Sequence, residues 1–394
     1  MKAPTMELSQ DKKIIIKKLV DWYRQHYNQS SYITVGGYAG TGKTTLIAIL
    51  REIIHKKNPK LKVAFVSYTG KASQVLKNKL TQSSTLYDHD YLGTIHSLIY
   101  SPIINQQQQI TGWKKKDDLD MDLIMIDEAS MVSYDIWQDL LSYQTAIIAV
   151  GDHGQLPPIN DQFNLMAAPD LRLEKIHRQA QDNPIIQLSV IARKTGEIPA
   201  KQFSDQVIKV DRSDYRAQEM AERLIEDYDQ DTLILCGYNS TRKQLNQSIR
   251  QSLGFFEYQP QPRDRVICLR NNHSKGIYNG MLGTIVSINQ EDENWYFAEV
   301  DMDDLEENFT GLISVKQFQQ EKAMNFTDRR SEVMKGDLFD FGYALTVHKA
   351  QGSQAKRVIL FEERFKQMDN EMWQRWLYTA VTRAEEELYI FGQD

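Results

Sequence analysis

One short segment of this chain has the residue types and spacing that bind phosphate groups. Gly37-Tyr38-Ala39-Gly40-Thr41-Gly42-Lys43-Thr44 fits the pattern G-x-x-x-x-G-K-T. Glycines let backbone N–H groups turn inward around phosphate oxygens. Lys43 can then reach the β- and γ-phosphates of a nucleotide, and the Thr44 hydroxyl can ligate Mg²⁺. The pattern predicts a nucleotide site formed by Gly37, Gly40, Thr41, Gly42, Lys43, Thr44 and Thr45.

Two acidic residues follow a second apolar segment. Residues 123–126 predict a buried strand, and Asp127 and Glu128 come directly after it. Carboxylates at the carboxyl end of a parallel strand face the ligand crevice of an α/β sheet. We expect Asp127 to hold Mg²⁺ and Glu128 to position or deprotonate an attacking water. Gln155 follows another predicted strand, residues 146–150, and would lie near the γ-phosphate if the two strands are neighbours.

The elements around these residues indicate an α/β fold. Residues 32–35 are apolar and β-branched, which predicts a strand, and residues 45–55 place apolar side chains at helical spacing. Strand, glycine loop and helix, in this order, form the context that a phosphate loop requires. Strands continue to alternate with helices through residues 1–166, so we expect a first domain with a doubly wound sheet there.

Two stretches interrupt the alternation of strands and helices. In residues 100–116, two short β-prone pieces flank a glutamine run, which predicts either a protruding hairpin or a surface loop. In residues 264–335, strands follow one another through short turns without helices, which predicts a small β-barrel. A second α/β domain would then consist of residues 167–263 and 336–394.

The composition is that of an ordinary soluble globular protein. The chain has 394 residues, of which 41% are hydrophobic and 25% are charged, and no apolar run approaches the ~20 residues of a membrane span. The net charge of −6 disfavours a DNA-coating role, although a narrow groove needs only local contacts with phosphates. Cys236 and Cys268 each stand alone in an apolar run, which indicates buried free thiols in a reducing, cytoplasmic setting.

The motifs and their order resemble superfamily 1 helicases, in the branch that contains the phage Dda helicase and RecD. The matching segments are Gly37–Thr44, Thr69–Ala72, Thr94–Ser97, Asp127–Ser130, Gly151–Pro158, Arg178–Gln179, Thr346–Ser353 and Tyr378–Ala384. The resemblance implies two RecA-like domains with ATP and Mg²⁺ in the cleft between them, a duplex-splitting hairpin and an SH3-like barrel. It also implies a monomeric motor that moves 5′ to 3′ along single-stranded DNA and unwinds duplexes, with partners in replication or repair.

The same resemblance implies a role for individual residues. Besides Lys43, Glu128 and Gln155, the catalytic set would include Arg178 and Arg383, whose planar guanidinium groups suit the charge of a transferring phosphoryl group. The family positions that touch single-stranded DNA correspond here to Thr69, Lys71, Thr94, His96, Thr346, His348 and Lys349. Further DNA contacts would come from Lys275, Tyr278 and Asn279 in the barrel, and the hairpin wedge from Trp113 or Ile110.

The chain departs from the family pattern at two places. Relatives read adenine with a glutamine at a position that falls on Lys12 here, so the nearby Gln10 is our candidate for this contact. By spacing alone, Thr94 predicts a helix cap rather than a DNA contact. The second departure is the polar, glutamine-rich centre of the hairpin. It leaves a DNA-stimulated translocase with little unwinding as an alternative interpretation. A nucleotide-gated DNA-binding module is a third interpretation, which the intact hydrolytic residues disfavour.

Overall fold

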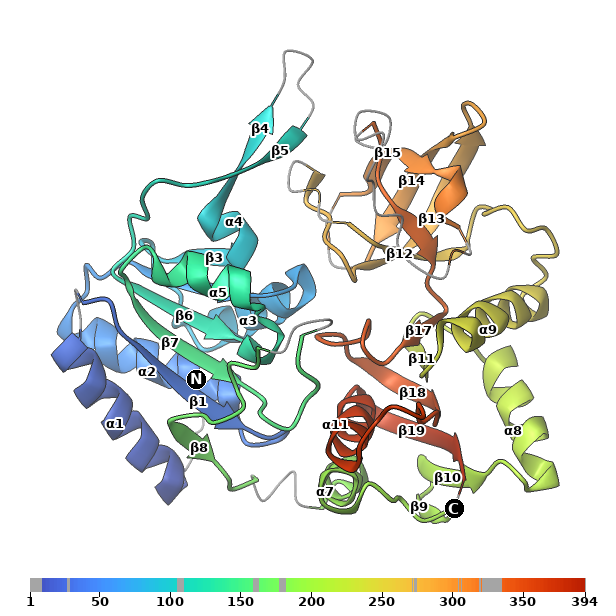
Figure 1. Cartoon of the computed structure of the whole chain (residues 1–394), viewed down its shortest axis with the longest axis horizontal. Coiled ribbons are helices and arrows are strands. Elements are labelled where there is room, and N and C mark those ends of the chain that lie inside the picture. The colour runs from blue at the N-terminus through green and yellow to red at the C-terminus, as the bar shows by residue number, and fades with distance from the viewer. Residues whose placement is uncertain are drawn as a thin grey trace. The chain divides into compact units, whose positions relative to one another are not determined.

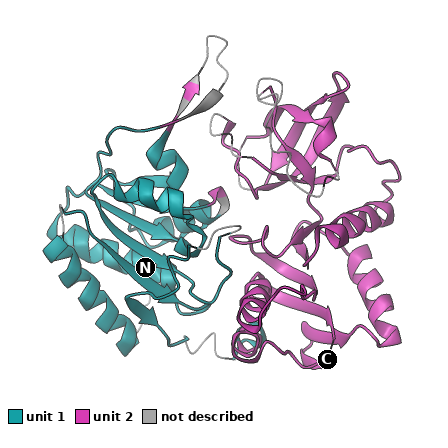
Figure 2. Cartoon of the chain, in the orientation of Figure 1, with its two compact units in different colours: residues 1–68, 72–100, 115–186 teal, residues 69–71, 101–114, 187–394 magenta. Residues whose placement is uncertain are grey.

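The computed structural model describes residues 9–26, 29–104, 110–158, 163–176, 182–270, 272, 275–303, 305, 307–318, 320 and 335–393 (Figure 1). The chain divides into two compact units (Figure 2). Unit 1 consists of residues 1–68, 72–100 and 115–186, and unit 2 consists of residues 69–71, 101–114 and 187–394. Each unit contains its own six-stranded sheet, so the α/β architecture predicted for both halves of the chain is confirmed.

Unit 1 is built on a sheet of parallel strands in the order β3-β2-β6-β7-β1-β8. Its strands are β1 (Tyr32–Gly37), β2 (Val63–Ser67), β3 (Tyr91–Thr94), β6 (Leu123–Asp127), β7 (Ala146–Gly151) and β8 (Leu171–Leu173). The helices are α1 (Gln10–His26), α2 (Lys43–Lys57), α3 (Gly70–Gln82), α4 (Ile95–Ile99), α5 (Tyr134–Leu141) and the 3-10 turn η1 (Ala129–Met131). Since β7 pairs with β6, the condition that we set for Gln155 is met.

Side-chain alternation along the central strands gives this sheet two cores. Phe65 and Met125 pack on one face with residues of α1 and α2. Val66 and Ile126, one position further along, pack on the opposite face with residues of α4 and α5. Successive side chains of a strand point to opposite faces, so a continuous apolar run is what a strand buried on both sides needs.

Strand β8 extends the first sheet further than we expected. It pairs with β1 through Val35 and Leu171, so the sheet continues past residue 166, where we expected the first domain to end. The strand has three residues, and a segment this short has too few positions to show a strand period.

The predicted hairpin region contains two strands that pair with each other. Strands β4 (Tyr100–Ile104) and β5 (Ile110–Lys115) form a two-stranded sheet. The glutamine run between them, residues 105–109, lies outside the described residues, as do the side chains of Ile110 and Trp113. The wedge role of this segment therefore stays a prediction.

Unit 2 contains a second mainly parallel sheet, in the order β17-β11-β18-β19-β10-β9. Strand β9 pairs antiparallel with β10 at one edge, and the other pairs are parallel. The strands are β9 (Gln202–Ser204), β10 (Val207–Asp211), β11 (Thr232–Cys236), β17 (Ala344–Thr346), β18 (Ala355–Phe361) and β19 (Ala384–Gly392). The helices are α7 (Pro184–Thr195), α8 (Tyr215–Glu226), α9 (Asn239–Ser252) and α11 (Asn370–Val381).

A five-stranded antiparallel sheet is inserted between α9 and β17, in the order β15-β14-β13-β12-β16. Its elements are β12 (Arg265–Cys268), β13 (Leu282–Gln290), β14 (Trp295–Met302), β15 (Phe309–Ser314), β16 (Phe339–Phe341) and the 3-10 turn η3 (Val315–Gln317). Backbone hydrogen bonds join Ser314 N to Asp337 O and Asp337 N to Leu312 O, which ties β15 to the segment before β16. The inserted sheet thus continues beyond residue 335, its expected end, while its likeness to an SH3 barrel stays a prediction.

The inserted sheet and the second parallel sheet share one apolar core. The buried cluster includes Ile234 and Ile359 of the parallel sheet together with Val266 and Phe339 of the insertion. Both cysteines are buried free thiols within the described residues, and burial raises the pKa of Cys236 and of Cys268 to about 12. Among the described residues, no helix is both long enough and apolar enough to cross a membrane.

Candidate active site

The phosphate loop joins the end of β1 to the first residue of α2. Gly40 and Gly42 have φ angles of 76° and 78°, a left-handed conformation that glycine adopts without a steric penalty. The Thr41 hydroxyl donates to Tyr38 O at 2.7 Å and holds the loop curled. Helix α2 begins at Lys43, so the positive end of its dipole lies at the loop, and an anion would be stabilised there.

A threonine and an aspartate meet at the end of β6. Thr44 Oγ1 donates to Asp127 Oδ2 at 3.0 Å, and the backbone N–H of Glu128 donates to Asp127 Oδ1 at 2.9 Å. Burial and then the neighbouring Glu128 carboxylate raise the pKa of Asp127 to about 6, against the opposing charge of Lys43. The hydroxyl and carboxylate oxygens are hard donors of the kind that Mg²⁺ prefers, so Thr44 and Asp127 fit a magnesium site.

Glu128 is the most strained residue of this group. Its φ of 53° and ψ of 40° place it in the left-handed region, which costs a residue with a Cβ atom about 1–2 kcal/mol. Its Oε2 atom is buried and has no hydrogen-bond partner among the described residues. A strained backbone and a buried, unsatisfied carboxylate oxygen are features that cluster at functional sites.

A second aspartate completes the carboxyl edge of the sheet. Asp152 follows β7, is fully buried, and lies 3.5 Å from Lys43 Nζ. Its Oδ2 atom accepts from Gln155 Nε2 at 3.4 Å, so the aspartate links the loop lysine to the predicted γ-phosphate sensor. Asp152 lies in the segment Gly151–Pro158, which matches the family motifs, but no role was predicted for it. Its position directly after a buried strand, like that of Glu128 after β6, is the signal that could have indicated it.

The structure thus brings the first-domain residues of the predicted catalytic set together in unit 1. Lys43 Nζ also donates to Tyr38 O at 3.3 Å, which holds the ammonium group over the loop. Gly37 is the last residue of β1 rather than part of the loop, and Thr45 lies in the first turn of α2. The group offers the ammonium of Lys43, a hydroxyl, an amide and three carboxylates at the positive end of the α2 dipole. This set suits the binding and hydrolysis of a nucleoside triphosphate with Mg²⁺.

The first turn of α1 reaches the same edge of the sheet. Asp11 accepts from the backbone N–H of Lys175 at 3.3 Å, shortly after Leu173 pairs with Gly37. Gln10 is exposed at the start of the helix, whereas Lys12 is buried, and this burial lowers its pKa.

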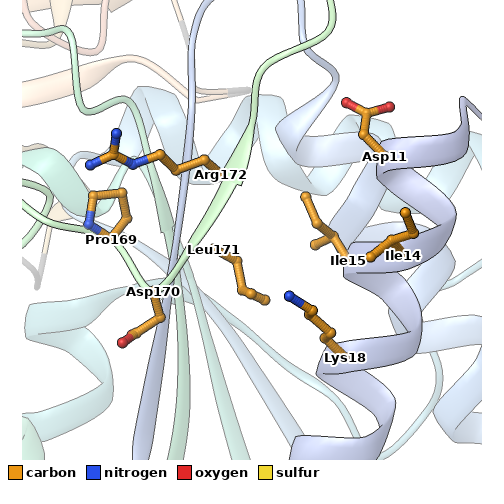
Figure 3. Close-up of a pocket in the computed structure, with 8 residues that line it drawn as sticks. All are labelled: Asp11, Ile14, Ile15, Lys18, Pro169, Asp170, Leu171 and Arg172. Carbon is orange, nitrogen blue, oxygen red and sulfur yellow. The ribbon is translucent and has the colours of Figure 1, made fainter.

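A cavity of about 360 Å³ lies between α1 and the edge strand β8. In Figure 3, Ile15 and Lys18 of α1 and Leu171 of β8 point into the space between the two elements. The residues that line the cavity come from α1 and from the β8 region, not from the phosphate loop. The cavity is therefore a feature separate from the phosphate-binding group.

In unit 2, Arg383 lies between α11 and β19 and is almost fully buried. Its guanidinium group donates to Thr379 O and to Ser353 O, each at 3.0 Å. These bonds fix the arginine against the segment Thr346–Ser353, which the sequence motifs also indicated. Arg178 lies outside the described residues.

Four candidate DNA contacts lie before β4, and their side chains have different surroundings. Thr94 caps α4 in a reciprocal capping box with Ser97, which confirms the helix start that its spacing predicts. Burial lowers the pKa of His96, whose ring lies 5.8 Å from those of both Tyr68 and Tyr100. Thr69 precedes α3, and the side chain of Lys71 lies outside the described ones.

The candidate contacts of unit 2 differ in exposure: Thr346 is buried, His348 and Lys349 are half-buried, and Lys275 is exposed. Burial lowers the pKa of His348, and it lowers the pKa of Lys349 to about 8; Thr346 is buried at the end of β17. Lys275 pairs with Asp337 at 3.0 Å and lies over the Phe309 ring.

The two barrel candidates that remain lie next to each other in the chain. Tyr278 packs partly into the core of the inserted sheet, and Asn279 follows it at the turn before β13.

Two family models match the chain. The AAA domain matches residues 22–212, and the UvrD-like helicase C-terminal domain matches residues 341–391. The ATP-dependent RecD2 DNA helicase of Deinococcus radiodurans is 25% identical over 383 residues, covering 91% of this chain and 47% of the relative. The RecBCD enzyme subunit RecD of Buchnera aphidicola is 25% identical over 441 residues, covering 92% of this chain and 70% of that relative. The chain therefore spans about half the length of the first relative and more of the second.

A solved structure shares the fold over nearly the full length of this chain. The Pif1 helicase from Bacteroides in complex with ADP-AlF3 and single-stranded DNA is 20% identical, with a TM-score of 0.54, and the match covers 98% of this chain and 92% of that one. This likeness supports a RecA-like helicase fold. The motifs, the site at the carboxyl edge of the first sheet and these relatives together show that the chain belongs to the superfamily 1 helicases of the RecD, Pif1 and Dda type.

Proposed function

We propose that the chain is an ATP-dependent DNA helicase that moves 5′ to 3′ along single-stranded DNA and unwinds tailed duplexes. The observation that carries this proposal is Glu128, a strained residue with a buried, unpartnered oxygen beside the bonded pair Thr44 and Asp127. Such an arrangement costs stability, and a site that activates a water molecule needs it. The relatives are a DNA helicase and a RecBCD subunit, and the similar structure holds ADP-AlF3 and single-stranded DNA.

In this proposal the phosphate-binding group of unit 1 binds and orients the nucleotide. The loop amides and Lys43 bind the β- and γ-phosphates, Thr44 and Asp127 hold Mg²⁺, and Gln10 contacts adenine. Bound Mg²⁺ would supply charge neutralisation on the phosphate oxygens. Glu128 accepts a proton from the attacking water, and Gln155, held by Asp152, lies beside the reacting phosphate.

Unit 2 contributes the residues that would couple hydrolysis to movement. We assign Arg383 and Arg178 to the γ-phosphate, where guanidinium groups stabilise spread-out negative charge. Arg383 is bonded to Ser353 O, within the segment that also contains Thr346, His348 and Lys349. Because that segment is also our candidate DNA contact, one arginine would report the nucleotide state to the DNA side of the same unit.

The proposed DNA track uses phosphate contacts without sequence preference. Hydroxyl groups and cations on phosphates position a strand but do not read its bases. Besides Thr346, His348 and Lys349 of unit 2, the candidate contacts are Thr69, Lys71, Thr94, His96, Lys275, Tyr278 and Asn279. We assign strand separation to Trp113 of the 100–116 hairpin and strand holding to an SH3-like insertion. The motor would act as a cytoplasmic monomer with replication or repair partners.

The first experiment is strand separation with ATP and Mg²⁺ on two matched duplexes, one with a 5′ and one with a 3′ single-stranded tail. We expect unwinding of the 5′-tailed duplex only. Unwinding of the 3′-tailed duplex would contradict the proposed polarity while leaving the motor in place. DNA-stimulated hydrolysis without unwinding of either duplex would favour the translocase, an alternative that the glutamine-rich centre of the hairpin supports.

A further inference from the structure

Both strands of the 100–116 hairpin are bonded to one short helix at their base. Strand β4 starts at Tyr100 and β5 ends at Lys115, and both residues belong to unit 1. Helix α5 of the same unit carries Asp139, and Tyr143 follows the end of that helix. We call Tyr100, Lys115, Lys116, Asp139 and Tyr143 the hairpin clamp.

Asp139 bonds to both strands at once. Its Oδ2 atom accepts from the Tyr100 hydroxyl, and its Oδ1 atom accepts from Lys115 Nζ at 3.0 Å. Burial alone would raise the pKa of Asp139, but these two bonds outweigh it, so the pKa is lowered. The carboxylate is therefore ionised near neutral pH and bridges the first residue of β4 to the last residue of β5 with charge-assisted bonds.

Tyr143 and Lys116 hold the backbone on either side of the hairpin. The Tyr143 hydroxyl lies 2.9 Å from Ile99 O, just before β4, and 2.8 Å from Lys116 O, just after β5. Lys116 Nζ donates to Ser97 O at 2.9 Å and to Leu98 O at 2.8 Å, and its backbone N–H donates to Ile99 O. The ammonium group thus satisfies carbonyls at the end of α4, where a cation is favoured.

The clamp also connects the hairpin to both sites of unit 1. The short turn η1, which is buried, leads from Glu128 to α5, so the helix that carries Asp139 is the next helix after the proposed general base. Helix α4, which Lys116 caps, carries the candidate DNA contact His96. These contacts therefore join the base of the hairpin to the elements that carry the proposed nucleotide site and the candidate DNA contacts.

We propose that Asp139 and Tyr143 are positioning residues that fix the two ends of the hairpin, Tyr100 and Lys115, to helix α5 of unit 1, so that movement along DNA becomes strand separation. This inference rests on the proposed helicase function, since the wedge role of the hairpin is part of that proposal. A loosely held wedge would yield when the duplex junction resists it, and the motor would then hydrolyse ATP without opening the duplex. The Tyr100 ring lies 5.8 Å from the ring of the candidate DNA contact His96, but no clamp residue belongs to the phosphate-binding group of unit 1, so hydrolysis itself does not require them.

The test is the double variant Asp139→Asn with Tyr143→Phe, which removes the charge and the bridging hydroxyl and keeps side-chain size. The matched control is Asp135→Asn, the same change at an exposed position of the same helix. We expect the double variant to lose about tenfold in the unwinding rate of a 5′-tailed duplex, because small displacements of a working group are costly. Hydrolysis stimulated by single-stranded DNA should stay within about twofold of the unmodified protein, since no residue of the nucleotide site changes.

A second readout does not depend on helicase activity. Hydrogen exchange of the backbone amides of residues 101, 103, 104 and 110–114 should become about tenfold faster in the double variant and stay unchanged in the control. Tyr100→Phe removes only the bond to Asp139 Oδ2, so it should reproduce part of the exchange effect of Asp139→Asn, which also removes the charge that pairs with Lys115. Adding Tyr100→Phe to Asp139→Asn should change the exchange little, because both changes act on the same Tyr100 bond.

The outcomes separate a failed clamp from a failed helicase. Faster exchange with unchanged unwinding would overturn the positioning role, and so would equal losses of unwinding and hydrolysis. Unchanged exchange would overturn the clamp itself. If the unmodified protein unwinds no duplex, the proposed function fails, while the exchange experiment still decides whether Asp139 and Tyr143 hold the hairpin.

Discussion

The carboxyl edges of the two parallel sheets differ in what occupies them. In unit 1 the edge carries the glycine loop and Glu128, whose buried oxygen has no partner among the described residues. In unit 2 the equivalent edge is filled by Glu363, which follows β18. Its carboxylate accepts from Gly237 N at 2.8 Å, Tyr238 N at 2.9 Å and Thr241 Oγ1 at 2.6 Å.

The difference shows how one type of fold serves two purposes. In unit 1 the start of α2 is available to a phosphate, while in unit 2 the start of α9 already holds the protein's own anion. Beside Glu363, Lys209 pairs with Glu362 at 2.8 Å in a buried ion pair. The edge that we propose for catalysis keeps a strained glutamate with an unsatisfied oxygen, whereas at the other edge the Glu363 carboxylate accepts three hydrogen bonds at the start of α9 and stabilises the unit.

The largest expected effect is at the unsatisfied edge. We expect Glu128→Gln to lower the turnover number for ATP by about 10³-fold, because a positioned general base contributes on the order of 10²–10⁴. Nucleotide binding should persist, since the loop and Lys43 are unchanged. Steady-state hydrolysis with saturating single-stranded DNA measures the turnover number, and nucleotide titration measures binding. Turnover within tenfold of the unmodified protein would show that Glu128 is not the base.

The proposed catalytic residue of unit 2 lies at the opposite end of its sheet. Arg383 directly precedes β19, at the amino end of the strand, away from the filled edge. We expect Arg383→Ala to spare nucleotide binding and to lower turnover by about 10³-fold, the lower range for arginines that stabilise a transferring phosphoryl group. The same hydrolysis and titration assays measure this effect.

Because Arg383 also bonds to Thr379 O and Ser353 O, urea unfolding must accompany the kinetics. Arg375→Ala, on the preceding helix α11 and partly exposed, is the control for a general loss of an arginine from this part of the unit. Normal turnover by the Arg383 variant would refute the assigned role. Equal loss in the Arg375 variant would assign the effect to the helix rather than to the phosphate contact.

The filled edge should respond in the opposite way. We expect Glu363→Ala to destabilise the protein by about 2–4 kcal/mol, because it leaves three donors at the start of α9 without their charged acceptor. Turnover under folding conditions should stay within about twofold, since catalysis is assigned elsewhere. Urea unfolding and steady-state hydrolysis test the two expectations, with the exposed Glu371→Ala as the control. A stable but inactive Glu363 variant would erase the distinction between the two edges.

The sequence predicted the parts of the site that lie in consecutive residues. The loop from Gly37 to Thr44 and the pair Asp127 and Glu128 each follow a strand that has a clear apolar pattern, so local rules located them. Asp152 was missed because its importance comes from Lys43, which is distant in the chain and becomes a neighbour through sheet pairing.

The DNA-facing predictions show a limit of the same kind. The strand contact of Lys275 stays a prediction, and the structure adds that its ammonium group pairs with Asp337 and lies over Phe309, two partners that no local pattern reveals. Strands β8 and β16 were missed because three residues cannot display a period. The αL conformation of Glu128 was equally hidden, since glutamate has no preference for it and the surrounding fold imposes it.

The smallest effect tests whether Glu128 stores strain. In Glu128→Gly the steric cost of the left-handed conformation, about 1–2 kcal/mol, disappears, and the greater flexibility of the unfolded glycine offsets roughly 0.5–1 kcal/mol of that gain. The carboxylate with its buried, unpartnered Oε2 atom is also removed, so we expect a net stabilisation of about 1 kcal/mol, measured by urea unfolding, in an inactive protein. The matched control is Gln144→Gly, at an exposed residue with a φ of 54°. The control has the same backbone relief but no buried, unpartnered carboxylate oxygen, so Glu128→Gly should gain more stability than Gln144→Gly. A smaller gain would mean that the surroundings of Glu128 already compensate its carboxylate, and the contrast between the two sheet edges would then rest on chemistry alone, not on stored strain.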